Sequence, residues 1–442
     1  MRKFIIMWFG QLVSVLGSAL TQFALAVYIY QKTGSSTQLG LSLLAGTLPF
    51  ILFAPFAGAL VDRWNRKWVI LAADLGAGVS TLTIWVLLSA GRLEIWHIYA
   101  VIGALGIFST LHYPAYQAAI TQLVPRQHYG RTAGMNQLRD ALSQIVAPML
   151  AGFLMVSIEV KGLILIDFAT YLVAIATLLA INIPKQAVTA EGITARGSLV
   201  KEAAFGWLYI KARPGLLGLL GLFALVNFAL GFQGVLFTPL VLSFSNAGVL
   251  GNILSFSGLG LLAGSLLMST WGGTRRKVYS LLAGIFFLGV TTMLVGLRAD
   301  VIFIGAASFV FALMLPVANG SSQAIWQAKV APDIQGRVFS IRALIANIAA
   351  PLAYLLAGPL ADALFEPAMA EGGFLSSTVG GIIGNGAGRG IGVIFILMGL
   401  LICVATLLCL FNPGVVHVED EQPGFTAGTI RDFNQAEVME NV

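Results

Sequence analysis

Long apolar stretches recur along the whole chain, and short clusters of glycine, proline and charged residues separate them. Crossing a hydrocarbon core of ~30 Å takes ~20 helical residues, and stretches of 18 or more are common here. The stretches are continuous and lack the alternation of barrel strands, so they favour helices. Lipid satisfies no backbone polar group, which leaves only helices and closed barrels as spanning structures. The pattern therefore predicts an all-α membrane protein.

Reading the polar clusters as boundaries predicts twelve transmembrane helices. The predicted spans are 4–30, 38–61, 68–90, 95–119, 134–157, 162–183, 214–242, 247–271, 278–297, 301–325, 338–361 and 390–411. The longest internal connection divides the chain into two bundles of six helices, 1–183 and 214–411. This linker, 184–213, is expected to be cytoplasmic, and its mixture of apolar and charged residues suits either an interfacial helix or another structured segment. The tail, 412–442, is acidic from Glu419 onward and is predicted to be disordered.

Composition and charge fit this prediction and exclude a soluble enzyme. The chain is 58% hydrophobic and 10% charged, whereas soluble domains are about a quarter charged. Lys and Arg concentrate at the amino terminus, in the loops that follow even-numbered spans, and in the linker. The positive-inside rule then predicts that both termini are cytoplasmic. The net charge of +6 is therefore interpreted as a topology signal, and no nucleic-acid partner is expected.

The two halves repeat each other's motifs. Gly130-Arg131 is matched by Gly336-Arg337, and Ala147-Pro148 by Ala350-Pro351. With the basic clusters Arg66-Lys67 and Arg276-Lys277, the matches keep offsets of 203–210 residues and the same order. Two repeats of six spans with the same orientation are typical of carriers that place a substrate site between rocking halves.

A basic loop after the second span resembles the signature of a known family. Gly58-Ala-Leu-Val-Asp62-Arg63-Trp-Asn-Arg66-Lys67 is similar to the cytoplasmic loop motif of the major facilitator superfamily, with Asn65 in place of a glycine. The amino-terminal run from Gly10 to Ser35 resembles the branch of macrolide-efflux proteins and enterobactin exporters. Ala147-Pro148 to Ala151-Gly152 is only weakly similar to the glycine–proline motif of antiporters.

This resemblance implies the major facilitator fold and a secondary transporter that acts as a drug:proton antiporter. The expected function is export of an amphipathic small molecule across an inner membrane by a monomer, with protons as coupling ion and lipids as neighbours. A lipid, lysolipid or siderophore transporter of the same fold is the first alternative. A non-transporting receptor or assembly partner is the second. No enzymatic activity, cofactor or metal is expected.

The loop motif suggests a gate between the halves. Asp62 ends span two, where the start of span eleven offers the positive end of a helix dipole. We predict that Asp62 docks there and that Gly58 lets the helices approach. The alternative is that the basic residues only orient the chain in the membrane. The other candidate gating residues are Arg63, Arg66, Lys67, Arg337 and Arg342.

Three charged residues lie within predicted spans. Asp74 and Arg139 fall ~10–12 Å inside the cytoplasmic boundary at helical rise, and an isolated intramembrane charge is costly, so an ion pair is predicted. The alternative is that this pair is purely structural and has no role in transport. Asp167 lies ~8 Å inside the external boundary, and its own half has no basic residue predicted at that depth. A carboxyl without a cation favours its neutral form, so Asp167 is the predicted proton carrier. The alternative is that Asp167 interacts only with the helix dipole.

Polar faces on spans one, four, seven and ten predict a substrate pathway, and the family resemblance implies that these spans line the centre. Small and polar residues also mediate ordinary helix packing in membranes, and this alternative stays open for each residue. The candidates are Gln11, Ser14, Ser18 and Gln22; Ser109, Tyr113 and Tyr116; Asn227 and Thr238; and Asn319, Ser322, Gln323 and Trp326.

The glycine-rich stretch Gly384–Gly390 is similar to a phosphate-binding loop. No strand precedes it and the predicted topology places it outside, so a flexible external loop is the preferred interpretation.

Overall fold

The computed structural model describes residues 1–125, 128–183, 206–330 and 335–420; the side chains of 54–63 and 335–337 are among those it does not describe. Every regular element in these ranges is helical, which confirms the predicted fold class. Eleven helices among the described residues are long and apolar enough to cross a membrane.

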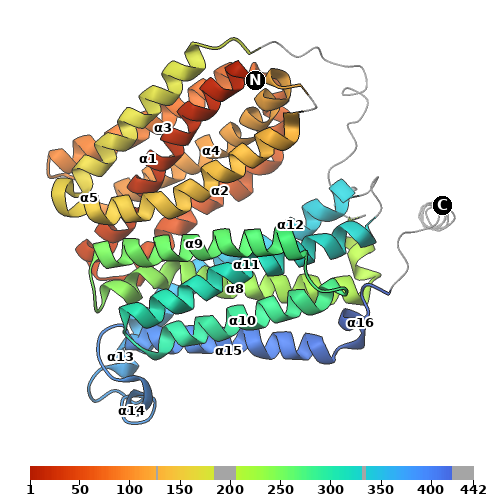
Figure 1. Cartoon of the computed structure of the whole chain (residues 1–442). Helices are drawn as coiled ribbons and strands as arrows, with labels where there is room; N and C mark the ends of the chain where they lie inside the picture. The colour runs from red at the N-terminus through yellow and green to blue at the C-terminus, as the bar shows by residue number, and fades with distance from the viewer. Residues whose placement is uncertain (126–127, 184–205, 331–334, 421–442) are drawn as a thin grey trace, which may run out of the picture.

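The amino-terminal half contains five continuous helices. They are α1 (Arg2–Thr33), α2 (Ser36–Arg63), α3 (Arg66–Ser89), α4 (Ile95–Leu123) and α5 (Tyr129–Leu179). α5 bends sharply at Glu159, whose φ of 55° and ψ of −175° are not helical. Figure 1 shows both arms of α5 extending from this bend toward the end where the amino terminus lies, so that the chain direction reverses at the bend. α5 therefore supplies the two spans predicted at 134–157 and 162–183, and the count of twelve is compatible with the structure.

The carboxy-terminal half begins at Pro214. Its long helices are α8 (Pro214–Leu242), α9 (Ala247–Trp271), α10 (Lys277–Leu297), α11 (Val301–Lys329), α12 (Gln335–Pro359) and α15 (Arg389–Phe411). Its short elements are the π-helical turn η2 (Leu360–Phe365), α13 (Glu366–Met369), α14 (Gly380–Ile383) and α16 (Pro413–Val416). η2 continues directly from α12, so this helical segment extends beyond the predicted end at residue 361.

Two segments expected to be irregular have defined contacts. The Glu366 carboxylate accepts hydrogen bonds from the backbone N–H groups of Gly388 (3.0 Å) and Ile391 (2.9 Å), which anchors the glycine-rich loop at the start of α15. In the tail, the Glu419 carboxylate accepts a hydrogen bond from Val278 N at 3.0 Å. Within 412–420, α16 packs against α8, and Glu419 contacts the start of α10. The rest of the predicted tail, 421–442, lies outside the described residues.

The linker is only partly within the described residues. Residues 206–211 are helical, and the Tyr209 hydroxyl donates to the carbonyl of Lys329 at 2.8 Å. Residues 184–205 of the linker lie outside the described residues.

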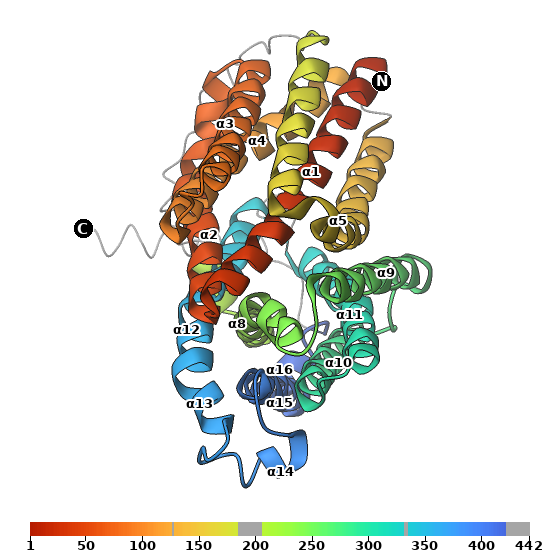
Figure 2. The same cartoon turned by 90° about the vertical axis from the view of Figure 1, so that its left-hand side faces the viewer.

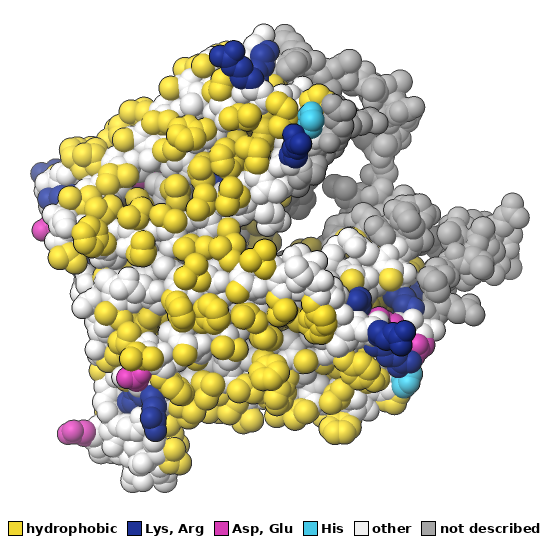
Figure 3. All heavy atoms as spheres, in the orientation of Figure 1, with side chains coloured by type: hydrophobic (Ala, Val, Ile, Leu, Met, Phe, Trp, Pro, Cys, Tyr) yellow, Lys and Arg dark blue, Asp and Glu magenta, His cyan; other side chains and the backbone are white. Residues whose placement is uncertain are grey.

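The two halves meet at one end of the molecule and diverge at the other. We call the end that carries the amino terminus and α16 the termini face, and the end that carries the bend of α5 and the short helices α13 and α14 the opposite face (Figures 1 and 2). A hydrophobic cluster toward the opposite face joins both halves and includes Leu39, Ala151, Leu240 and Leu250. Toward the termini face each half has its own cluster. The halves thus enclose a wedge that opens to the termini face, as Figure 3 shows.

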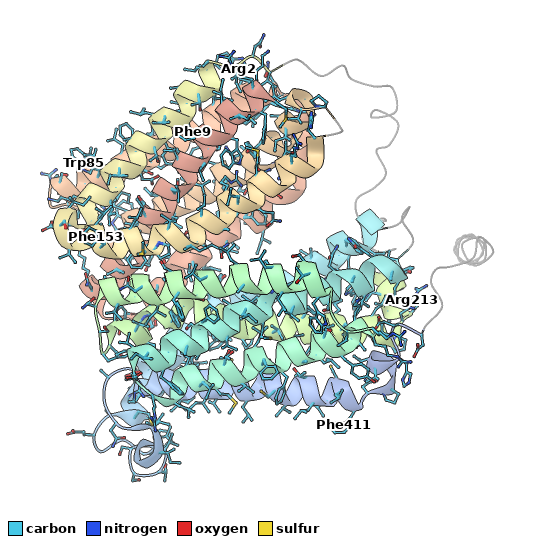
Figure 4. The ribbon with its side chains drawn as sticks, viewed as in Figure 1. Arg2, Phe9, Trp85, Phe153, Arg213 and Phe411 are labelled. Carbon is cyan, nitrogen blue, oxygen red and sulfur yellow. The ribbon has the colours of Figure 1, made fainter. Side chains whose placement is uncertain are left out.

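The flanks of both halves are covered by apolar side chains, whereas Lys, Arg, Asp and Glu gather at the ends (Figure 3). Phe9, Phe153 and Phe411 extend away from the ribbon in Figure 4 and are at least 55% exposed. Such a large apolar surface is stable only against lipid. The protein is therefore a multi-pass integral membrane protein.

Candidate substrate pathway

A cavity of about 530 Å³ lies between the halves. It is lined by α1 to α5 from the amino-terminal half and by a short stretch of α8 from the other half. Most of its wall is apolar, and polar side chains from several of these helices interrupt it. The predicted pathway residues that line it are Gln11, Ser14, Ser18, Gln22, Ser109 and Thr238.

Asp167 lies in the wall of this cavity and is 2% exposed. Its Oδ1 is 3.2 Å from the Ser18 hydroxyl on α1, and its Oδ2 is 3.4 Å from the Thr81 hydroxyl on α3. The Ser18 hydroxyl also lies 2.9 Å from the Tyr171 hydroxyl. A hydroxyl can donate to a carboxylate or accept from a carboxylic acid. This group of hydroxyls can therefore satisfy Asp167 in either protonation state.

Asp74 forms a second polar cluster in the same cavity. It is 4% exposed, and its Oδ2 accepts a hydrogen bond from Gln11 Nε2 at 3.0 Å. Its Oδ1 lies 3.3 Å from His112 Nε2, which makes an ion pair when the imidazole is protonated. The ring of His112 stacks nearly parallel on Tyr116, with centroids 5.9 Å apart.

The predicted ion pair between Asp74 and Arg139 is not formed. Arg139 instead pairs with its neighbour Asp140 at 2.9 Å, and its guanidinium lies 5.3 Å from the centre of the Tyr116 ring. Equal depth in the membrane was the basis of the prediction, but depth does not determine which way a helix turns its side chain. His112 takes the place beside Asp74 that was assigned to Arg139.

The two carboxylate clusters are linked by matching spacings on two helices. On α1, Gln11 contacts Asp74 and Ser18, seven residues later, contacts Asp167. On α3, Asp74 and Thr81 are also seven residues apart, and Thr81 contacts Asp167. Seven residues are close to two helical turns, or ~10 Å. The carboxylates are thus two levels of one polar wall, and a proton or a ligand could contact each in turn.

Several predicted pathway residues lie elsewhere. Tyr113 is 61% exposed, and Tyr116 is buried with its hydroxyl 3.1 Å from Asn136 Oδ1. The Asn227 amide donates to the carbonyl of Phe223 in its own helix at 2.9 Å. None of the three lines the cavity.

The polar face of α11 instead meets a basic residue of α12. Arg342 donates to Gln323 Oε1 at 3.1 Å and to Ser322 Oγ at 2.9 Å, and its guanidinium lies 4.9 Å from the centre of the Trp326 ring. Asn319 is exposed on the same helix. These residues form a group within the carboxy-terminal half and are absent from the residues that line the cavity.

The proposed gate of the loop motif is only partly within the described residues. Only the helical backbone is described for Gly58, Asp62, Arg63 and Arg337. Arg66 Nη1 donates to the carbonyl of Ala118 at 3.3 Å, and Lys67 Nζ donates to that of Leu179 at 3.2 Å. The docking of Asp62 on α12 therefore stays a prediction.

Four residues near the carboxylates were not among the predicted site residues. They are Thr21, Thr81, His112 and Tyr171, and all but Thr81 line the cavity. Helical spacing could have indicated two of them, because Thr81 follows Asp74 by seven residues and Tyr171 follows Asp167 by four. The position of His112 beside Asp74 depends on how α3 and α4 pack, which spacing alone does not determine.

The sequence profile of the Major Facilitator Superfamily matches residues 7–354. The chain belongs to the major facilitator superfamily. This superfamily member is 28% identical over 365 residues to macrolide efflux protein A of Streptococcus pyogenes, a match that covers 81% of this chain and 89% of the relative.

One further relative and one solved structure are also similar to this superfamily member. It is 31% identical over 157 residues to the enterobactin exporter EntS of Salmonella choleraesuis, covering 34% of this chain and 36% of that one. Its fold is similar to that of a bacterial homologue of the human lysosomal transporter Spinster in an inward-facing, unoccupied conformation. That similarity has a TM-score of 0.68 at 14% identity, covering 93% of this chain and 98% of the other. The protein is therefore a membrane transporter of this superfamily.

Proposed function

We propose that this transporter exports an amphipathic small molecule, drug-like or a natural product, by alternating access in exchange for protons. Its cavity is within the roughly 300–1,000 Å³ range of small-molecule sites, and its wall is mainly apolar with several polar side chains. The similarity to macrolide efflux protein A supports export of such a molecule.

The observation that carries the proton coupling is the setting of Asp167. An arginine beside a carboxylate would favour its charged form, whereas hydroxyl groups serve either form. Asp167 is surrounded by the hydroxyls of Ser18 and Thr81. It takes up a proton when the cavity faces outward and releases it when the cavity faces inward. Substrate leaves by the same cavity in the opposite direction.

The orientation proposed for this cycle makes the termini face cytoplasmic and the membrane a plasma (inner) membrane. Basic residues support it, because Arg66, Lys67, Arg276 and Lys277 lie at the starts of α3 and α10 on the termini face. The positive-inside rule places such clusters on the cytoplasmic side. The wedge then opens to the cytoplasm, and the structure corresponds to the inward-open state of the cycle.

The direct test is transport by the full chain in liposomes under an imposed pH gradient. The probes are a macrolide, a catecholate siderophore and a lysolipid. Transport of each probe is measured with an acidified lumen, and again after an ionophore has collapsed the pH gradient. We expect the macrolide to accumulate only while the gradient is present. Equal accumulation of the macrolide with and without the pH gradient would exclude proton antiport. Movement of the lysolipid or the siderophore alone would replace the proposed substrate class.

A further inference from the structure

A single carboxylate from the carboxy-terminal half rests on the start of a helix in the amino-terminal half. Asp362, in η2, accepts four hydrogen bonds from the beginning of α2. Its Oδ2 lies 2.7 Å from Ser35 Oγ, 2.9 Å from Thr37 N and 2.7 Å from Thr37 Oγ1. Its Oδ1 lies 3.1 Å from Ser36 N. The backbone N–H groups of Ser36 and Thr37 can only donate, and they use one carboxylate oxygen each. Hydrogen bonds donated to both oxygens favour the ionised carboxylate.

These contacts use the property of helix starts that favours anions. The first backbone N–H groups of a helix have no partner inside it, and the helix dipole adds a partial positive charge there. Ser35 already caps α2 by accepting from Gln38 N at 3.4 Å. Asp362 satisfies two further N–H groups, at Ser36 and Thr37. Hydrogen bonds to a charged acceptor are stronger than neutral ones.

The helices around this contact touch backbone to backbone. A Cβ added at Gly358 of α12 would lie 2.2 Å from Thr37 Cα, and one added at Gly40 of α2 would lie 2.3 Å from the carbonyl oxygen of Tyr354. The two glycines thus bring α12 close enough for Asp362 to reach the start of α2. Opening the opposite face requires α2 and α12 to separate here, so all four hydrogen bonds belong to the closed state.

The repeat supplies a natural comparison within the same chain. Subtracting the offset of 203 residues that relates Pro351 to Pro148 places Glu159 at the position of Asp362. Glu159 borders a crevice with Asn246 and Ala247 at the start of α9. α9 is capped by its own Asn246, which accepts from Val249 N at 3.0 Å. Within the described part of the chain, the Glu159 carboxylate makes no hydrogen bond to α9.

We propose that Asp362 is a positioning residue of the transport cycle whose carboxylate holds the opposite face shut while the termini face is open. It is the counterpart of the predicted docking of Asp62 on α12. Each of the helices α2 and α12 would carry an aspartate near its carboxyl end, and each would receive the other helix's aspartate at its amino end. One pair of helices would then hold either face closed, but not both together. A contact made in one state alone shifts the equilibrium toward that state.

The test measures the populations of the two states in the full chain, in liposomes without substrate. Spin labels at Gly91 and Arg298 report the width of the opposite face, and labels at Trp64 and Arg275 that of the termini face. Cys403 and Cys409 are first replaced by alanine. We expect Asp362→Asn to raise the ratio of opposite-face-open to termini-face-open molecules about ten-fold, because its amide nitrogen cannot accept from the α2 donors.

Two more variants keep the result decisive. Glu159→Gln is the matched control and should leave both distance distributions unchanged. Thr37→Val removes one hydroxyl donor to Asp362 at nearly constant shape, and should shift the ratio in the same direction by a smaller factor. This variant provides the test if the Asp362→Asn protein does not fold. Unchanged populations in a folded Asp362→Asn protein, or an equal shift in Glu159→Gln, would overturn the proposal. The inference rests on the proposed alternating access. The experiment measures distances and not transport, so a failure of proton-coupled export and a failure of this inference can be told apart.

Discussion

The two halves of the transporter have similar architecture and contribute unequally to the cavity. The amino-terminal half supplies Asp74, His112 and Asp167 together with the polar face of α1. The carboxy-terminal half contributes only Gly234, Val235 and Thr238 among the described lining residues. In the second half, the position equivalent to Asp74 falls near Gly284. A Cβ added at Gly284 would lie 3.2 Å from Ala318 N. There, close helix packing replaces a charged group.

This difference indicates that the repeat specifies a scaffold and leaves the chemistry free to differ between halves. In this protein the amino-terminal half carries the groups that could bind protons. The carboxy-terminal half provides Asp362 and much of the surface that closes the opposite face. If this division holds, substitutions in the two walls of the cavity should have unequal effects on transport.

The largest effect is expected at Asp167. Asn keeps the shape of the side chain but is neutral and cannot carry a proton, so Asp167→Asn should abolish gradient-driven uphill export while substrate exchange continues. Both are measured in liposomes, with and without a pH gradient. Asp140→Asn, at a half-exposed aspartate outside the cavity, is the control. An Asp167→Asn protein that still concentrates substrate with a normal pH dependence would make Asp167 a structural residue.

A smaller effect is expected at Asp74, and it also tests the corrected pairing. Asp74→Asn loses the charged acceptor of the Gln11 amide and should reduce proton-driven export about ten-fold. Arg139→Gln should reduce it by about three-fold or less, because its partner Asp140 is half exposed and such pairs contribute little. Exchanging the two charges should restore neither expression nor transport. Recovery in the exchanged protein would show that Asp74 and Arg139 do pair in another state of the cycle.

The smallest effect is expected on the other wall. Thr238→Val replaces one hydroxyl by a methyl group and should change export by about two-fold. This change is smaller than the change expected from the loss of a typical hydrogen bond. Ser18→Ala, across the cavity, removes a hydroxyl partner of Asp167 and should reduce proton-driven export more strongly. Comparable losses in the two variants, measured at equal protein amounts, would contradict the unequal division between the halves.

Much of the fold follows from local properties of the sequence. Apolar length predicts the spans, because a helix must bury its backbone polar groups in lipid by itself. The loop motif and the repeated motifs identify the superfamily that the sequence profile confirms. The polar face of α1 could also be predicted, because four polar residues at helical spacing in an apolar span need a neighbour other than lipid.

Partners across helices could not be predicted in the same way. Arg139 and Asp74 share a depth, yet the rotation of α3 and α5 directs them to different neighbours, Asp140 and His112. Asn319 and Ser322 share a polar face on α11, but Arg342 meets Ser322 outside the cavity. Asp362 shows no local signal at all, because its partners at Ser35 to Thr37 lie more than 320 residues away.

The sequence by itself therefore determined the number and type of the spans, the repeat and the superfamily, since each depends on hydrophobicity, length or short motifs. Only the tertiary structure decided that Asp74 and Asp167 share one cavity and that the molecule is closed at the opposite face. Only the tertiary structure placed a carboxylate of one half on a helix start of the other. The physical reason is that lipid contact constrains each helix separately, whereas cavities and contacts between halves depend on how the helices rotate and pack against one another.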